Sequence, residues 1–253
     1  MRLFLHELRA QQLLFWRNRE AAFFSFLFPI ILLVLLGSVY GDEPIEGIRA
    51  ATYLLVGLLG YGIAATAFAS LAITLVVRRE QGLLKRVRGT PLPPATYLSA
   101  VIASMVVVIA LQVVAQLLIG VYALDADWPA APGSFAVGVL LGAAAFAALG
   151  VAVTALVSTA EGSSAVVNAI YLPMAFISGA FFSRQEMPAF LEAISDLLPL
   201  TYLLDLIRAT FVDGEDLASS AGPLAAVAVW GLFGLVVAVR MFRWEPREGI
   251  TGA

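Results

Sequence analysis

The sequence predicts an all-α membrane protein with six transmembrane helices, and three observations lead to this prediction. Hydrophobic residues make up 61% of the 253 residues, charged residues only 13%, and the mean hydropathy is +0.93. Several uncharged runs are longer than the roughly 20 residues that a helix needs to cross a hydrocarbon core about 30 Å thick. Most basic residues lie in short segments between these runs. We expect residues 1–253 to form one transmembrane domain, because a soluble domain would need more charge.

The chain begins with a basic segment, residues 1–20, that we expect to form an amphipathic helix in the membrane interface. Apolar side chains such as Phe15 would share one side of this helix and arginines the other, although Gln11 and Gln12 interrupt the pattern. An ordinary charged anchor before the first span is the alternative. The first span is expected at about 21–40. It lacks a small-residue cleavage pattern at its end, so we expect it to be retained.

The second and third spans are expected at about 50–77 and 97–124, with the basic loop 78–96 between them. Each uncharged run would form a helix longer than the hydrocarbon core is thick, so the two helices could hold the loop out in the cytosol. The stretch "EQGLLKRVRG" predicts a short helix whose exposed apolar stripe suits insertion into a groove of a partner. This stripe consists of Leu83, Leu84 and Val87. A basic loop that only sets the topology is the alternative.

The remaining spans are expected at about 134–159, 163–182 and 221–240. The first of these three is rich in glycine and alanine and includes Gly138 and Gly142. Small residues let helix backbones approach closely, so this span should be packed inside the bundle.

The apolar segment between the fifth and sixth spans carries charges and prolines. The cost of a central charge exceeds the gain from several leucines, so we expect no span here. Two short helices at about 187–198 and 201–212 should instead dip into the outer membrane face or lie on it. An acid and a base three residues apart on the second helix could pair, with an exposed surface pair as the alternative. These two residues are Asp205 and Arg208.

The distribution of charge predicts the topology. Residues 1–20, 78–96 and 240–253 hold twelve of the 15 lysines and arginines, and the positive-inside rule places these segments in the cytoplasm. Most acidic residues, among them Asp42 and Glu43, fall in the segments on the opposite side. We therefore expect a multi-pass protein of the cell membrane with both termini in the cytoplasm.

The residue inventory predicts no catalytic, metal or cofactor site in this chain, and we expect no nucleic-acid partner. Cysteine is absent and His6 is the only histidine, which excludes thiolate chemistry and leaves too few ligands for zinc. The expected spans carry no carboxylate in their interiors, so an intramembrane enzyme and an ion-coupled carrier are both poorly supported. The only lysine, Lys85, follows a leucine, so the glycine-lysine pair of a phosphate-binding loop is missing. ATP and Mg²⁺ for uphill transport would have to be bound by another polypeptide.

Two stretches resemble a known family. The first, "RREQGLLKRVRGTPLPP", is similar to the pattern R-E-x-x-G-T/L-L-K/E-R-L-x-x-T-P-L that follows the second span in the membrane subunits of ABC-2-type ABC transporters. This is the drug- and polysaccharide-exporter class, which includes daunorubicin-resistance-like permeases. Leu83 and Val87 replace the usual threonine and leucine. The matching residues are Arg79, Glu80, Gly82, Leu84, Lys85, Arg86, Thr90 and Pro91.

The second stretch, residues 171–214, resembles the same family's pattern of Pro, Ser-Gly, paired aromatics, Met-Pro, Leu-Pro-x-x-Tyr and Asp-x-x-Arg. Ser183 stands where a proline often follows the aromatics. The matching residues are Pro173, Ser178, Gly179, Phe181, Phe182, Met187, Pro188, Leu198, Pro199, Tyr202, Asp205 and Arg208.

The resemblance implies a dimer of six-helix subunits, made with a second copy or a related permease, in which each subunit docks a cytoplasmic ABC ATPase that binds ATP and Mg²⁺. It also implies an N-terminal interfacial helix, a coupling helix between spans two and three, and re-entrant outer helices between spans five and six. On this resemblance, we expect ATPase coupling to use Arg79, Glu80, Gly82, Leu83, Leu84, Lys85, Arg86, Val87, Thr90 and Pro91. An outer gate and lid would use Ser178, Gly179, Phe181, Phe182, Pro188, Pro199, Asp205 and Arg208. For the two phenylalanines, simple packing or interfacial anchoring is the alternative.

The favoured hypothesis is an export permease that moves hydrophobic or amphiphilic cargo with ATP hydrolysed by a partner subunit. Charge-free spans favour cargo such as drugs, lipids or lipid-linked glycans. The alternative is a non-transporting membrane scaffold that recruits a cytoplasmic protein through the 78–96 loop.

Overall fold

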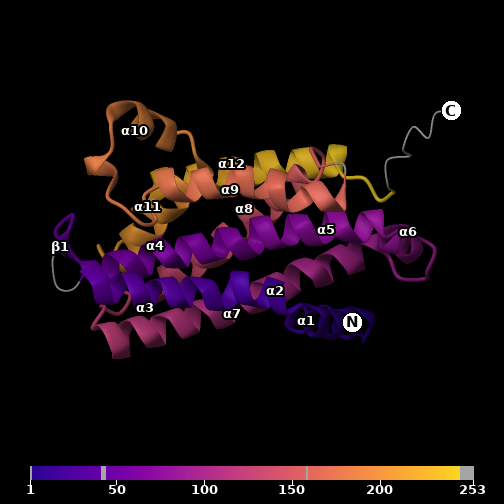
Figure 1. Ribbon diagram of the computed structural model, residues 1–253, viewed down its shortest axis with the longest axis horizontal. Coiled ribbons are helices and arrows are strands. Elements are labelled where there is room, and N and C mark those ends of the chain that lie inside the picture. The colour runs from indigo at the N-terminus through magenta and orange to yellow at the C-terminus, as the bar shows by residue number, and fades with distance from the viewer. Residues whose placement is uncertain (1, 41–43, 158, 246–253) are drawn as a thin grey trace.

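The computed structural model describes residues 2–40, 44–157 and 159–245, and these residues are nearly all α-helical (Figure 1). Three residues used in the topology prediction lie outside the described ranges, namely Asp42 and Glu43 on the expected outer side and Arg247 on the inner side.

In the described ranges, the elements follow one another as helices, with one two-stranded hairpin near residue 46. In order they are α1 Arg2–Arg17, α2 Arg19–Ala22, η1 Phe23–Leu27, α3 Phe28–Tyr40, β1 Pro44–Ile45, β2 Ile48–Arg49, α4 Ala50–Ala64, η2 Ala65–Ser70, α5 Leu71–Glu80, α6 Leu83–Arg88, α7 Pro94–Leu124, α8 Pro132–Val153, α9 Ala160–Ile177, η3 Arg184–Glu186, α10 Ala189–Ser195, α11 Pro199–Phe211 and α12 Ala221–Met241.

Five helical segments within the described ranges are long and apolar enough to cross a membrane. Four of them match the first, second, third and sixth expected spans to within a few residues. The remaining segment, Pro132–Val153, begins close to the start of the expected fourth span. The five segments are Phe23–Tyr40, Ala50–Glu80, Pro94–Leu124, Pro132–Val153 and Ala221–Met241.

The fourth span is shorter than the sequence predicts, because α8 ends at Val153 and not at residue 159. The amides of Thr154, Ala155 and Leu156 each bond to the carbonyl three residues earlier, which tightens the last turn and ends the helix. The next helix, α9, starts afresh at residue 160, with the Thr159 hydroxyl accepting a bond from the Gly162 amide at 3.2 Å.

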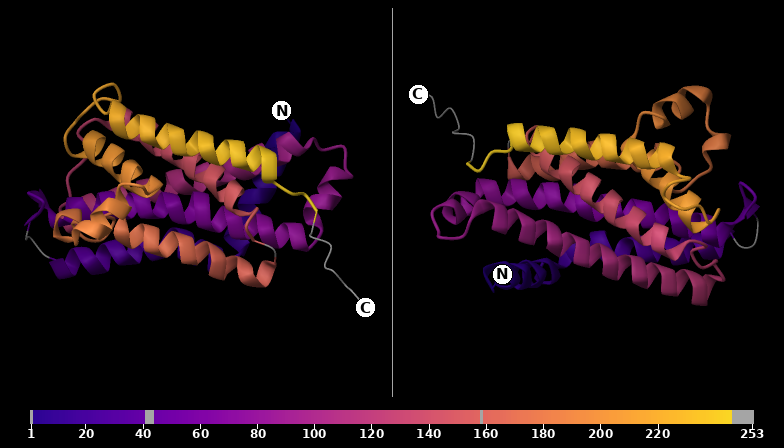
Figure 2. Two further views of the ribbon diagram at one scale, coloured as in Figure 1. Left: turned by 90° about the horizontal axis from the view of Figure 1, so that it is seen from above. Right: turned by 180° about the vertical axis from the view of Figure 1, so that it is seen from behind.

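The fifth expected span differs most from the structure, because α9 is not among the five segments. Its first half carries Glu161 and Asn168, and it ends at Ile177, five residues before the predicted end. The chain turns there through Gly179, whose φ of +83° favours glycine. Even so, α9 runs along the bundle beside α5 from one end towards the other (Figures 1 and 2).

The helices lie side by side along one long axis, with α6 at one end and the β1–β2 hairpin and α10 at the other (Figure 1). Both α1 and the end of α12 lie towards the α6 end (Figure 2). At the centre is the continuous segment formed by α4, η2 and α5: 94% of a stretch of 18 apolar residues within it is buried, against 17% of a stretch of the same length in α12. The remaining helices pack around this central segment.

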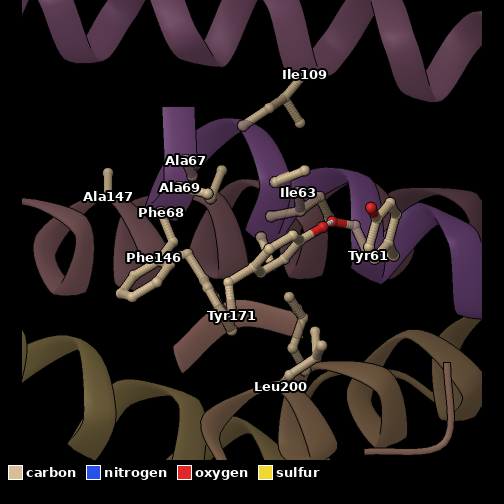
Figure 3. Close-up of a cluster of buried hydrophobic side chains, with 14 of the residues drawn as sticks. Tyr61, Ile63, Ala67, Phe68, Ala69, Ile109, Phe146, Ala147, Tyr171 and Leu200 are labelled. Atoms are coloured by element: carbon tan, nitrogen blue, oxygen red, sulfur yellow. Dashed lines mark hydrogen bonds between the residues drawn. The ribbon is translucent and has the colours of Figure 1, made fainter. Parts of the chain in front are cut away.

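Aromatic and small side chains from several helices fill the core (Figure 3). The rings of Tyr61 on α4 and Tyr171 on α9 lie 5.3 Å apart, and the Tyr171 hydroxyl donates to the Tyr61 carbonyl at 3.2 Å. Phe146 of α8 and Leu200 of α11 close the cluster from the other sides. The expectation that the Gly/Ala-rich α8 is packed inside the bundle is confirmed.

Polar side chains from α7 are buried against the middle of the central segment. The Thr66 hydroxyl donates to Gln112 at 3.2 Å, and the Gln116 amide donates to the Leu58 carbonyl at 3.4 Å. Gly62 makes room for this contact, since a Cβ there would lie 1.7 Å from Gln112 Nε2. These bonds satisfy amides that hydrocarbon could not hydrate and hold α7 in register with α4.

The backbone of the turn that follows α9 packs directly against the central segment. A Cβ at Gly57 would lie 1.9 Å from the Ala180 carbonyl oxygen, so only glycine lets α4 and this turn meet.

We predict that Gly57→Ala lowers the free energy of unfolding by about 1–3 kcal/mol, the usual cost of overpacking. Unfolding of the detergent-solubilised protein measures the effect, with Gly222→Ala as control because nothing lies within 4 Å of a Cβ there. Equal stability of the two variants would contradict the packing described here.

Candidate functional site

The α6 end of the bundle is organised by three consecutive residues at the end of α5, which we call the α5 hub: Arg78, Arg79 and Glu80. All three point to other helices. Gly82, at φ +70°, then reverses the chain into α6.

Arg79 and Glu80 hold the connection between α8 and α9. Arg79 is only 4% exposed and donates to the Thr154 carbonyl at 3.1 Å and the Val157 carbonyl at 2.5 Å, just beyond the end of α8. The Glu80 carboxylate accepts a hydrogen bond from the Ala160 amide at the start of α9. A cation thus meets the carbonyl end of one helix and an anion the amide end of the next, which is the favourable sense for both helix dipoles.

Arg78 ties the hub to α1 and α7 on the other side. Its guanidinium donates to Gln11 Oε1 at 2.7 Å and to the Tyr97 hydroxyl at 2.9 Å. Gln12 in turn donates to the carbonyl and hydroxyl oxygens of Ser104 on α7 at 2.8 and 3.0 Å. The two glutamines that interrupt the amphipathic pattern of α1 are therefore the residues that dock it.

The expected exposed stripe on α6 is wrong in its details. Leu84 is fully buried and Val87 is partly buried, because these two residues, three apart, face the bundle. Leu83 remains 37% exposed, and the basic side chains beside it are exposed as well. The outward face of α6, as the structure has it, consists of Leu83, Lys85, Arg86 and Arg88.

The end of α6 lies where the sequence predicts it. The Thr90 hydroxyl donates to the Val87 carbonyl at 2.7 Å and accepts from the Leu92 amide at 3.3 Å. Thr90 and Pro91 are exposed in the turn that leads to α7. Helix α6 thus ends within the stretch EQGLLKRVRG, for which the sequence predicts a short helix.

At the other end of the bundle, the turn that follows α9 is held by α4 and α11. Arg208 Nη2 donates to the Gly179 carbonyl at 2.6 Å, and the Tyr53 hydroxyl donates to the Phe182 carbonyl at 3.0 Å. The Arg208 guanidinium also lies 4.7 Å from the centre of the Tyr53 ring, within cation–π range. One arginine and one tyrosine thus fix both sides of the turn.

The structure separates the two phenylalanines assigned to the gate. Phe181 is 6% exposed and packs edge-on against Tyr61 at 5.2 Å and beside Phe176 at 5.1 Å. Phe182 is 50% exposed. Phe181 belongs to the core, and only Phe182 is presented at the surface of the chain.

Ion pairs connect the short helices α10 and α11. Arg184 pairs with Asp196 at the end of α10 and, at 3.6 Å, with Asp205 on α11. The expected pair between Asp205 and Arg208 is present at 3.9 Å. Burial raises the pKa of the Asp205 carboxyl above its ordinary value, while both arginines act in the opposite direction.

The two outer helices differ in burial. One face of α11 is fully buried, including Leu203, Leu204 and Ile207, and it packs against α4, α8 and α12. The apolar face of α11 is therefore covered by protein, and the position of this helix relative to the membrane surface stays a prediction. By contrast, α10 exposes its large apolar side chains such as Phe190. Pro188 precedes α10, and Pro199 occupies the first position of α11, where proline is tolerated.

Some polar atoms at this end lack hydrogen-bond partners in the described part of the chain. They are Ser178 Oγ, Arg184 Nε and Arg208 Nε. No group of three or more His, Cys, Asp or Glu side chains among the described residues could hold a metal ion. The polar contacts at this end are hydrogen bonds and ion pairs that join the turn after α9, α10 and α11.

Sequence reasoning missed several residues that build these two ends. Tyr53 lies within an uncharged run and looks like part of an apolar span. Arg184 lies one residue after the substituted Ser183, whose hydroxyl donates to Glu46 of the β1–β2 turn at 2.5 Å. The acceptors of Arg79 are the backbone carbonyls of Thr154 and Val157, and a sequence does not show which backbone carbonyls are left without a helical partner. An arginine at the end of an apolar helix was the one available signal, because such a charge must find acceptors.

Comparison with known proteins gives concordant results. A model of the family described as ABC-2 type transporter matches residues 2–212. YvfS of Bacillus subtilis (strain 168), which carries the name of a transport permease, is 25% identical over 186 residues, covering 72% of this chain and 75% of YvfS. Nodulation protein J of Rhizobium leguminosarum bv. viciae is 30% identical over 99 residues, which is 39% of this chain and 38% of that protein. Nodulation protein J of Sinorhizobium fredii is 34% identical over 43% of this chain and 42% of its own length.

The Arg79 contacts lead to a prediction about local stability. Arg79→Gln should leave the α8–α9 connection with unpaired carbonyls, at a cost of about 1–3 kcal/mol. Amides from 154 to 163 should then exchange their hydrogens faster. Hydrogen exchange with mass spectrometry measures this, and Arg86→Gln, on the exposed face of α6, is the matched control. Unchanged exchange in Arg79→Gln would show that these bonds do not hold the connection.

Proposed function

The chain belongs to the ABC-2 type transporter family, and on that premise we propose that it is the permease of an exporter powered by a separate cytoplasmic ATPase. As a member of this family it is a membrane transport subunit and not a catalytic one. ATP and Mg²⁺ would be bound by the ATPase and not by this chain. The observation that carries the proposal is the α5 hub. It lies directly before the basic helix α6 in sequence and contacts α1 and α7 on one side and the α8–α9 connection on the other.

The proposed topology has six spans, with α9 as the fifth. Supporting this, α9 begins beside Glu80 at the α6 end and leads into the turn beside Tyr53 at the opposite end. Its polar first half packs beside the hub, where protein can replace lipid. An even number of passes agrees with α1 and the end of α12 lying at the same end (Figure 2). The basic residues at that end favour the cytoplasm.

In the proposed mechanism the outward face of α6 docks on the ATPase. When ATP draws two ATPases together, α6 moves with them, and the hub passes the movement on in two directions. Arg78 would carry it to α1 and α7, while Arg79 and Glu80 would carry it to the α8–α9 connection. Leu84 and Val87, which face inward, would keep α6 and the bundle moving as one body. Gly82 and Thr90-Pro91 would set where α6 starts and stops.

At the outer end, α10, α11 and the turn 178–182 would form the lid. Arg184 and Arg208 join all three parts, so breaking their contacts would release the lid while α11 stays anchored by its buried face. Phe182, which is exposed, would face a second copy across the exit. The cargo would be hydrophobic or amphiphilic, such as a drug, a lipid or a lipid-linked glycan, because the middles of the five long apolar helices carry no charge.

The coupling proposal predicts two different kinds of failure. Leu83→Asp combined with Arg86→Glu should weaken co-purification of the ATPase by about tenfold or more, since misplaced charge at an interface costs several kcal/mol.

Glu80→Ala should retain the ATPase but lose transport, because only the link to α9 is removed. Arg19→Gln, an exposed substitution on α2, serves as control for both. Undiminished ATPase binding in the first variant contradicts docking through α6, and normal transport by the second contradicts transmission through the hub.

The dimer proposal can be tested because the chain contains no cysteine. Phe182→Cys in membranes should form a reducible disulfide dimer on mild oxidation, since the two exits would face each other. Tyr122→Cys, also at an exposed position at the same end, is the control and should stay monomeric. A monomeric Phe182→Cys protein, or equal cross-linking of both variants, would rule out this arrangement of two copies.

A further inference from the structure

An open apolar groove of about 710 Å³ lies between α7, α8 and α12, and none of its lining residues belongs to the hub or the lid. Its floor is a row of small residues on α8, including Ala144 and Ala148. One wall is formed by Leu98 and Ile102 at the start of α7, and the other by a long stretch of α12. A groove of this size falls in the range of sites that hold small molecules.

The chemistry of the groove selects a hydrocarbon ligand. All the side chains that line it are apolar, and they include Leu232, Leu235 and Val239 along α12. A polar ligand would lose its hydrogen bonds here without replacement. A flexible hydrocarbon chain would fit, because the alanine floor leaves a channel between the larger side chains of the two walls.

The groove ends at basic and aromatic residues, which indicate the charge of the ligand's head. Its lining continues past α12 to Phe242 and Trp244, whose rings meet edge to face at 5.3 Å. Arg240 and Arg243 alternate with lining residues at this end, and both are exposed. Aromatic rings favour the depth of lipid headgroups, and arginines near the ends of membrane helices attract anionic ones.

We infer that this groove binds one acyl chain of an anionic phospholipid from the leaflet at the α6 end, with the phosphate held by Arg240 and Arg243. The inference does not depend on the ATPase or on the direction of transport. The residues after Glu245 are a poor alternative occupant, because their sequence contains a single large apolar residue, Ile250.

Trp244 provides a reporter at the mouth of the groove. The full chain carrying Trp16→Phe, Trp128→Phe and Trp230→Phe retains this single tryptophan. It would be reconstituted in vesicles of one fixed mixture of phosphatidylcholine and phosphatidylglycerol, in which only one of the two lipids carries bromine on its acyl chains. Bromine quenches tryptophan at contact, so the binding inference predicts stronger quenching when the phosphatidylglycerol is labelled.

Two sets of variants separate the chain from the head. Ala144→Leu with Ala148→Leu fills the floor and should reduce quenching by either label, whereas Ala136→Leu, on α8 but outside the groove, should not. Arg240→Gln and Arg243→Gln should keep the quenching but lower the preference for phosphatidylglycerol by about fivefold each.

Equal quenching by the two labels in the parent protein would overturn the anionic assignment. Quenching that is insensitive to filling the floor, or absent with both labels because protein covers the groove, would overturn the lipid site itself. Because none of these measurements involves transport, failure of the proposed function would leave the result unaffected.

Discussion

The fold depends on a constraint that applies at both ends of the central segment: a turn inside a membrane bundle exposes backbone carbonyls that hydrocarbon cannot hydrate. At one end Arg79 provides donors for the carbonyls that follow α8, and at the other Arg208 and Tyr53 provide them for the turn that follows α9. Both turns belong to the path of α9. The connection before α9 and the turn after it are thus each held by an arginine from a neighbouring helix.

This arrangement explains why the charged motifs are where they are. An arginine at the end of an apolar helix is expensive unless its donors are satisfied, and the open ends of neighbouring helices supply acceptors without any further charge. Glu80 completes the arrangement by accepting from α9. The two π-helical segments, η1 and η2, contact each other between these fixed ends. The central segment therefore has fixed ends and a π-helical middle. Short π-helical turns are frequently found at functional sites in helices.

Much of the fold could be predicted from the sequence, because uncharged runs and the cost of charge in lipid are strong constraints. The positions of the helices around residues 50–80 and 94–124 followed from that alone. The length of α8 and the end of α9 could not, since both depend on how backbone turns are tightened by residues of ordinary composition.

The candidate site was predicted less completely. The motif residues are found at the two ends of the bundle, but their orientation follows from packing that one sequence does not display. Leu84 faces inward while Leu83 faces outward, and Phe181 is buried while Phe182 is exposed. Gln11 and Gln12 interrupt the amphipathic pattern of the sequence, and their hydrogen-bond partners, on the hub and on α7, are visible only in the structure.

The near-complete enclosure of the central segment has a consequence for biosynthesis. A chain is made from its N-terminus, so residues 50–80 leave the ribosome before most of the helices that finally surround them. During that interval lipid is their only available solvent, and a run free of charge from residue 50 to residue 77 can remain there stably. The same side chains are therefore selected twice, first to be soluble in lipid and then to exclude it when α7, α8, α9 and α11 arrive.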